Sequence, residues 1–104
     1  MGYVYLIYDS EKCAYKIGVT RSKNSKRLKQ LQVGNSTELT LIYMHETEYP
    51  FRLETMLHNR YVNSRIMGEW YVLDDVDEFK NACAHLESCI NALRDNPFFT
   101  KNLK

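Results

Sequence analysis

The sequence predicts a small α+β fold, in which helices pack against one antiparallel sheet. Two runs rich in Tyr, Val and Ile, residues 2–8 and 14–20, flank a polar turn, which is typical of a β-hairpin. Apolar residues recur at helical spacing after Pro50 and again after Asp74. With 104 residues the chain can bury one modest core, so these elements are expected to share it.

The expected order of elements is ββαβαβα, with a helix and a third strand following the hairpin. Residues 25–33 can form this helix, because Leu28 and Leu31 lie on one side and Gly34 can end it. Residues 38–45 are expected to form the third strand. An order of this kind places helices on a small antiparallel sheet.

A second helix and a short strand are expected next. Pro50 suits the first turn of a helix, and helical signals continue to about residue 63. The buried stripe of this helix is expected to comprise Leu53, Leu57 and Tyr61. Gly68 interrupts the pattern, and residues 69–73 are then expected to form a strand.

The last helix has the clearest apolar face. Asp74 is a suitable N-cap, and Asn96-Pro97 ends the helical pattern. The expected apolar face consists of Phe79, Cys83, Leu86, Ile90 and Leu93. We therefore predict one domain over residues 1–95, followed by a C-terminal tail of residues 96–104.

The formal net charge of +1 conceals an uneven distribution of charge. From Lys12 to Lys29 there are seven Lys or Arg residues and no acid. Residues 69–95 contain seven acids and only two basic residues. A phosphate-binding face near the N-terminus with an acidic helix behind it would give this division. Two ordinary solvated faces would give it as well.

The cysteines and the hydropathy exclude several classes of protein. Cys13, Cys83 and Cys89 include no CxxC pair and cannot all pair, so no zinc or disulfide framework is indicated. No signal peptide and no apolar run of membrane-spanning length is recognisable. The chain is therefore expected in the cytoplasm, or in the host cytoplasm or nucleus if it is viral, without a membrane partner.

Polar residues at fixed places in these elements point to chemistry. Tyr5 and Lys16 would place a phenol and an amine side by side on the hairpin. In order and spacing, the chain resembles the GIY-YIG nuclease superfamily, in particular its small branch found in phage, viral and fungal proteins. The segments that carry this resemblance, within residues 2–73, are Val4-Tyr5-Leu6-Ile7, Tyr15-Lys16-Ile17-Gly18, Arg27, Leu53-Glu54, Leu57-His58 and Gly68-Glu69-Trp70-Tyr71.

The resemblance implies a metal-dependent endonuclease that hydrolyses phosphodiester bonds, with DNA as the expected substrate and a 5′-phosphate left on the product. Tyr5 would act as general base or position the water, and Lys16 and Arg27 are cations that would make a phenol a better base. The standard motif has Tyr where this chain has Lys16. Because strand residues alternate, only Tyr15 or Lys16 can point into the site. Lys16 is favoured because the small branch that the chain resembles has Lys at this position, where it could hold a phosphate or pass a proton.

The resemblance also implies how phosphate and metal are bound. Arg27 would bind the scissile phosphate, and Glu54 would bind Mg²⁺ or Mn²⁺. His58, four residues after Glu54 on one helical face, could pass protons or contact phosphate. Residues expected to bind the nucleic-acid backbone are Arg21, Lys23, Lys26 and Lys29. Trp70 is expected in the core, and no role follows for Glu69.

Purely structural roles and other functions are also compatible with the same residues. Tyr5 could simply pack in the sheet, Lys16 and Arg27 could be solvated, and Glu54 could pair with His58 on a helix surface. The whole chain could be a catalytically inactive module of the same fold that binds nucleic acid or protein. It could also be a structural or inhibitory partner of another nucleic-acid enzyme. A homodimer or a protein partner could supply sequence specificity, because phosphate contacts alone give little.

Overall fold

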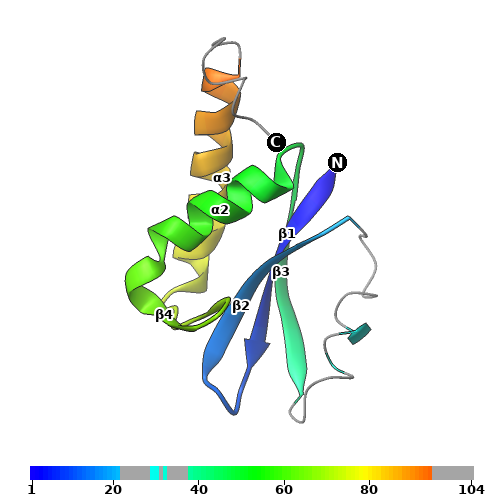
Figure 1. Cartoon of the computed structure of the whole chain (residues 1–104), viewed down its shortest axis with the longest axis vertical. Coiled ribbons are helices and arrows are strands. Elements are labelled where there is room, and N and C mark those ends of the chain that lie inside the picture. The colour runs from blue at the N-terminus through cyan, green and yellow to red at the C-terminus, as the bar shows by residue number, and fades with distance from the viewer. Residues whose placement is uncertain (22–28, 31, 33–37, 95–104) are drawn as a thin grey trace.

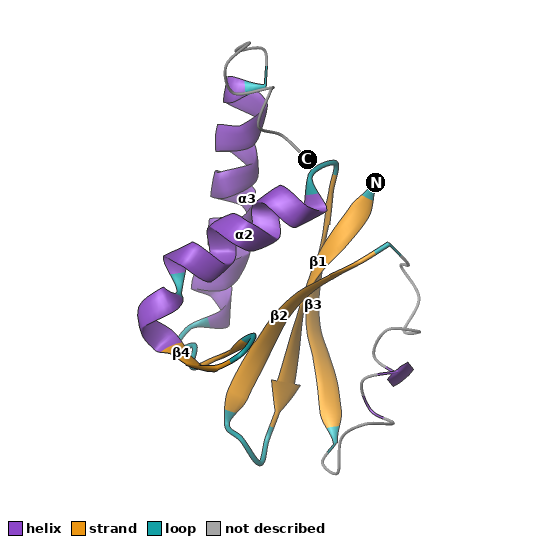
Figure 2. Ribbon diagram, viewed as in Figure 1, coloured by secondary structure: helices purple, strands orange, loops and turns teal. Residues whose placement is uncertain are grey.

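Two helices cover one face of a five-stranded antiparallel sheet (Figures 1 and 2). The structure is a computed structural model and describes residues 1–21, 29, 30, 32 and 38–94. The strand order in the sheet is β3-β1-β2-β5-β4. The predicted α+β class is confirmed, while the predicted tail at 96–104 lies outside the described residues.

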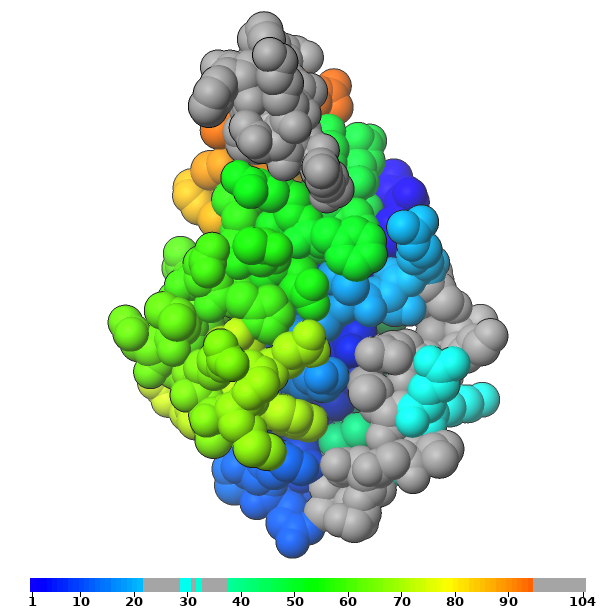
Figure 3. Space-filling view, in the orientation of Figure 1, coloured from blue at the N-terminus to red at the C-terminus, as the bar shows by residue number. Residues whose placement is uncertain are grey.

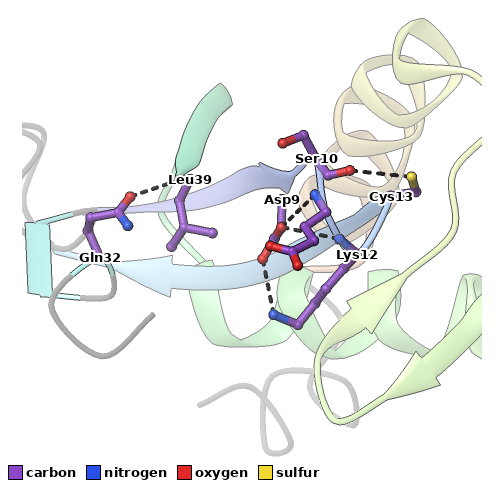
Figure 4. A network of polar contacts seen from close by, with 7 residues as sticks. Asp9, Ser10, Lys12, Cys13, Gln32 and Leu39 are labelled. Carbon is purple, nitrogen blue, oxygen red and sulfur yellow. Dashed lines mark hydrogen bonds and ion pairs between the residues drawn. The ribbon is translucent and has the colours of Figure 1, made fainter. Parts of the chain in front are cut away.

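The first hairpin consists of β1 (Gly2–Asp9) and β2 (Ala14–Thr20). Its turn is organised by the buried carboxylate of Asp9, which accepts hydrogen bonds from the backbone N–H groups of Glu11 and Lys12 (Figure 4). The same carboxylate pairs with Lys12 Nζ at 3.0 Å. These local bonds fix the turn and therefore the register of the two strands.

The third strand, β3 (Leu39–Thr47), pairs with the other side of β1. Its first residue is anchored by Gln32, whose side-chain oxygen accepts a hydrogen bond of 2.8 Å from the Leu39 N–H (Figure 4). Gln32 has helical backbone geometry, as do residues 29 and 30. The rest of the helix predicted at 25–33 lies outside the described residues.

The second helix, α2 (Pro50–Arg60), buries Leu53 and Leu57 of the predicted stripe, and the third member, Tyr61, is buried at its C-cap. The helix ends three residues earlier than expected and is followed by a short 3-10 helix, η1 (Val62–Ser64).

A second hairpin replaces the single strand that was expected at 69–73. It consists of β4 (Arg65–Met67) and β5 (Trp70–Tyr71), and Gly68 at its tip has a φ of +53°. Glycine adopts this left-handed conformation without a steric penalty. The sequence did not reveal β4 because all three of its side chains are exposed, so it lacks the alternating burial that marks a strand.

The last helix, α3 (Val76–Leu93), begins one residue later than predicted. Asp75, rather than Asp74, is the N-cap, and its side chain accepts hydrogen bonds from the N–H groups of Asp77 and Glu78. Leu93, predicted on the apolar face, is 46% exposed. No helix in the described part of the chain is both long and apolar enough to cross a membrane.

The two faces of the sheet carry separate apolar clusters. The larger cluster joins β1 and β2 to both helices through residues that include Val4, Leu6, Ile17 and Phe79. The smaller cluster lies on the opposite face and contains Tyr5, Ile7 and Leu39, with Leu41, Met44 and Trp70 packed against it. Trp70 was predicted in the core. It is only partly buried and packs against the edge of this smaller cluster. The alternation of side chains along β1 separates the two sets.

The capping assignment of α3 can be tested directly. Replacing Asp75 with Ala is expected to destabilise the protein by about 1 kcal/mol, because two N–H groups at the start of the helix lose their acceptor. Urea unfolding followed by circular dichroism measures this change. Asp74→Ala is the matched control and should have little effect. Equal destabilisation by both variants would contradict the assignment.

Candidate functional site

Tyr5 and Lys16 share one face of the sheet. Tyr5 pairs with Gly18 across the β1–β2 ladder, and Lys16 lies two residues before Gly18 on the same strand. Because side chains alternate, Tyr5, Gly18 and Lys16 point to the same side. Tyr15 instead packs against the larger cluster on the helical side. Of the two candidates at the second motif, Lys16 is thus the one on the face of Tyr5.

The Tyr5 phenol lies directly over Gly18. The Tyr5 side chain is 2% exposed, and a Cβ placed on Gly18 would come within 2.9 Å of its Cε1 atom and closer still to its hydroxyl. Only a residue without a side chain therefore leaves room for the phenol at this position. The phenol is held by packing from the smaller cluster.

Lys16 is held by contacts with the second hairpin. It lies opposite Trp70 in the β2–β5 ladder, and its ammonium is 5.9 Å from the centre of the Trp70 ring. The Lys16 Nζ atom forms an ion pair of 2.7 Å with Glu69 Oε2. The Lys16 side chain is 15% exposed and that of Glu69 is 46% exposed. The ion pair fixes the amine at the edge where β2 meets the hairpin.

Glu54 and His58 on α2 lie beside this ion pair. A metal ion could be held by three side chains here, those of Glu54, His58 and Glu69. Each offers one ligand atom, and these three atoms all lie within 4.8 Å of one another. His58 Nε2 is 3.6 Å from Glu54 Oε2, as the spacing of four residues on a helix allows. In Figure 3, α2, the second hairpin and β2 meet on one face of the molecule. Residues far apart in sequence thus form one polar cluster.

Tyr71 orients the imidazole of His58. The buried Tyr71 hydroxyl forms a short hydrogen bond with His58 Nδ1, and the two rings lie 5.3 Å apart. This bond directs Nε2 toward Glu54. Burial raises the pKa of the Tyr71 hydroxyl, and Arg65 acts in the opposite direction, while the Glu69 and Glu54 charges raise it further. Tyr71 is therefore a neutral phenol at pH 7.

The electrostatics of the cluster favour an added cation. Burial raises the pKa of the Glu54 carboxyl, His58 acts against this, and the Glu69 charge adds to it. Among the described residues, the Glu69 carboxylate pairs with the Lys16 ammonium and the Glu54 carboxylate lies beside the His58 imidazole, so a divalent ion between the two carboxylates would add favourable positive charge. Carboxylate oxygens and one imidazole nitrogen are suitable ligands for a divalent metal ion. The residues present therefore fit the metal that the resemblance implies.

Other predicted site residues are not part of this cluster. Arg21 lies just beyond β2, and its guanidinium is 5.9 Å from the centre of the Phe51 ring. Phe51 lies on α2, about one helical turn before Glu54. Lys29 is exposed. Arg27, Lys23 and Lys26 lie outside the described residues.

Two residues of the cluster were not expected from the sequence. Glu69 had no assigned role, and Tyr71 was noted only as part of a motif. Both reach the site because the second hairpin docks on β2, where the Glu69 carbonyl accepts a hydrogen bond from the Ile17 N–H. The signal that could have located them is the glycine at position 68, which can form the tight turn of such a hairpin.

Comparison with known proteins agrees with this description at a coarse level. No curated protein and no solved structure shows significant similarity to the chain. The profile of the T5orf172 domain matches residues 2–93, which is most of the chain. The match includes Tyr5, Lys16, Glu54 and the second hairpin. The chain therefore belongs to the T5orf172 domain family, which is nuclease-associated and GIY-YIG-like in a broad sense.

Proposed function

We propose that this protein is a metal-dependent endonuclease that hydrolyses phosphodiester bonds in DNA. One observation carries the proposal: a group of metal-ligand type, Glu54 with His58 and Glu69, lies against the Lys16 amine. Two residues along the same strand, Gly18 makes room for the Tyr5 phenol. These are the functional groups that phosphodiester hydrolysis requires. The family membership supports a role connected with nucleic acid.

Glu54 is the proposed ligand of the metal ion, which we take to be Mg²⁺ or Mn²⁺. The half-buried carboxylate projects from a rigid helix, so its position is well defined. A bound divalent ion would stabilise negative charge developing on the leaving oxygen.

The remaining steps belong to side chains of the protein. Tyr5 would hold the attacking water through its phenolic oxygen and, in the deprotonated form, take up a proton from that water. Lys16 would bind a non-bridging oxygen of the phosphate, a contact that requires the ammonium to leave Glu69. Arg27 would bind the same phosphate bidentately, and His58 lies beside Glu54, where it can contact the bound ion.

Contact with the rest of the nucleic acid would come from basic side chains that follow β2 in the sequence. Arg21 and Lys29 are exposed, and Lys23 and Lys26 complete the proposed set. Such contacts neutralise phosphates and provide affinity that falls with added salt, but they read no bases. Weak sequence preference is therefore expected for this chain alone.

The proposal is tested with purified protein on supercoiled, branched and single-stranded DNA. We expect nicking with Mg²⁺ or Mn²⁺ and none with EDTA, because removal of the ion removes charge stabilisation at the leaving oxygen. Gel electrophoresis of the products gives the rate, and phosphatase-dependent labelling identifies the 5′-phosphate. A folded protein that cuts none of these substrates with either ion would contradict the proposal.

A second candidate function is a binding module without catalysis. Two observations favour it: the formal net charge is only +1, and the Lys16 amine is already paired with Glu69. A module of this kind would bind DNA or protein in a binding assay, but it would leave plasmid DNA uncut in the presence of either metal ion. Binding without cutting in the experiment above would support this alternative.

A further inference from the structure

We propose that Glu54, His58 and Glu69 together form a three-ligand site for a divalent transition-metal ion, with Mn²⁺ preferred over Mg²⁺. The inference deepens the metal part of the proposed function, but it does not depend on hydrolysis. It adds His58 and Glu69 to Glu54 as ligands of the metal ion. It also makes Glu69 a residue with two alternative partners, the metal ion and Lys16.

The first support is the distance between the three side chains. Their ligand atoms lie within 4.8 Å of one another, and the His58 and Glu54 atoms are 3.6 Å apart. Two ligands bound at right angles to one ion of this size lie about 3 Å apart. Small side-chain rotations would therefore bring all three onto a common centre. Glu69, at 46% exposed, has the freedom to make such a rotation.

The second support is the hydrogen bond between Tyr71 and His58. Imidazole ligands in metal sites usually bond through their other ring nitrogen to a neighbouring polar group, which fixes the ring. Tyr71 occupies this position at Nδ1, and it is 1% exposed and rigidly packed. Nε2 is thereby left on the side of Glu54. An ordinary surface pair of Glu and His would need no such buried support.

The third support is the balance of charge. Lys16 pairs with Glu69, and His58 lies beside Glu54, in this partly buried place. A divalent ion between the two carboxylates would compete for Glu69 and leave the ammonium of Lys16 without its present partner. The released ammonium would then be available to an anionic oxygen. Metal binding would in this way prepare Lys16 for a phosphate.

The nature of the ligands decides which ion is preferred. Mg²⁺ favours oxygen ligands and retains much of its water, whereas imidazole nitrogen suits later transition ions better. Mn²⁺ accepts both kinds of ligand and is also paramagnetic, so it is the probe of choice.

The test measures Mn²⁺ binding to the whole protein without nucleic acid. Isothermal titration calorimetry should show that Glu69→Gln weakens Mn²⁺ binding about tenfold or more, as expected when one anionic ligand is lost. The matched control is Glu87→Gln. Glu87 also forms a pair with a histidine, at 3.2 Å from His45, but it is not part of the group of Glu54, His58 and Glu69. This control should bind Mn²⁺ as the original protein does. Equal affinity in Glu69→Gln and the original protein would overturn the proposal.

Electron spin echo spectroscopy of bound Mn²⁺ gives an independent measurement. Modulation from a coordinated ¹⁴N nucleus is expected in the original protein and should be lost in His58→Gln. Nitrogen modulation that persists in His58→Gln would overturn the assignment of His58. Circular dichroism of each variant verifies that it is folded.

These measurements separate the two proposals. Three-ligand Mn²⁺ binding without any DNA cutting would leave this inference standing and remove the proposed nuclease. DNA cutting combined with unchanged Mn²⁺ affinity in Glu69→Gln would leave the proposed nuclease standing and remove the three-ligand metal site.

Discussion

Replacing Glu54 with Gln is expected to lower the rate of metal-dependent DNA cutting by at least about 100-fold. The substitution keeps the size of the side chain but removes the charge that would hold the ion beside Lys16 and Glu69. Glu54 lies on the partly exposed side of α2, so the fold should be retained. The initial rate of plasmid nicking, measured at saturating Mn²⁺, gives the effect.

Two controls make this result interpretable. Glu87→Gln removes a carboxylate from another His–Glu pair and should cut at the original rate. DNA affinity of Glu54→Gln, measured by fluorescence anisotropy in EDTA, should change by less than about threefold, because the phosphate contacts are made elsewhere. Undiminished cutting by Glu54→Gln would eliminate Glu54 as the essential metal ligand.

Replacing Gly18 with Ala is expected to have the second large effect. The new methyl group would overlap the Tyr5 phenol, which is buried and cannot turn away freely. Overpacking of this kind destabilises a protein by roughly 1–3 kcal/mol. Because the displaced phenol could no longer hold the water, cutting should also fall by at least about 100-fold. Urea unfolding and plasmid nicking measure the two effects separately.

Two further variants separate packing from chemistry at this position. Tyr5→Phe keeps the ring and removes only the hydroxyl, so it should lose activity with little loss of stability. Shortening the clashing side chain in the double variant Gly18→Ala/Tyr5→Leu should recover part of the stability but none of the activity. If Tyr5→Phe cuts DNA at the original rate, the phenol has only a structural role.

The first hairpin and the helical stripes could be predicted because their signals are local. The apolar alternation of β1 and β2 and the spacing of Leu53 and Leu57 each depend on neighbours in sequence. Alternation along the strand required Lys16 and Tyr15 to face opposite sides, whereas the choice of Lys16 for the site rested on the family resemblance. The N-cap of α3 was misplaced by one residue because two consecutive aspartates offer the same side chain.

The composition of the polar cluster could be predicted only in part. Glu54 and His58 share a helix, so their proximity follows from helical geometry. Glu69 is 53 residues from Lys16 in the sequence, and only the docking of the second hairpin brings them together. The exposed strand β4, which completes that hairpin, gives no periodic signal. Sequence patterns report burial, whereas the meeting of two charged side chains from distant segments depends on tertiary structure.

The separation of the site residues along the chain has a consequence for biosynthesis. Lys16 belongs to the first hairpin, Glu54 to α2 and Glu69 to the second hairpin, so the site needs contacts between distant segments. Contacts of this kind form late in folding, because they require closure of long loops. While the chain is still on the ribosome, its first hairpin can exist before Glu69 has been synthesised. We therefore expect the proposed metal site to appear only when folding is nearly complete, so that incomplete chains would lack the proposed nuclease activity.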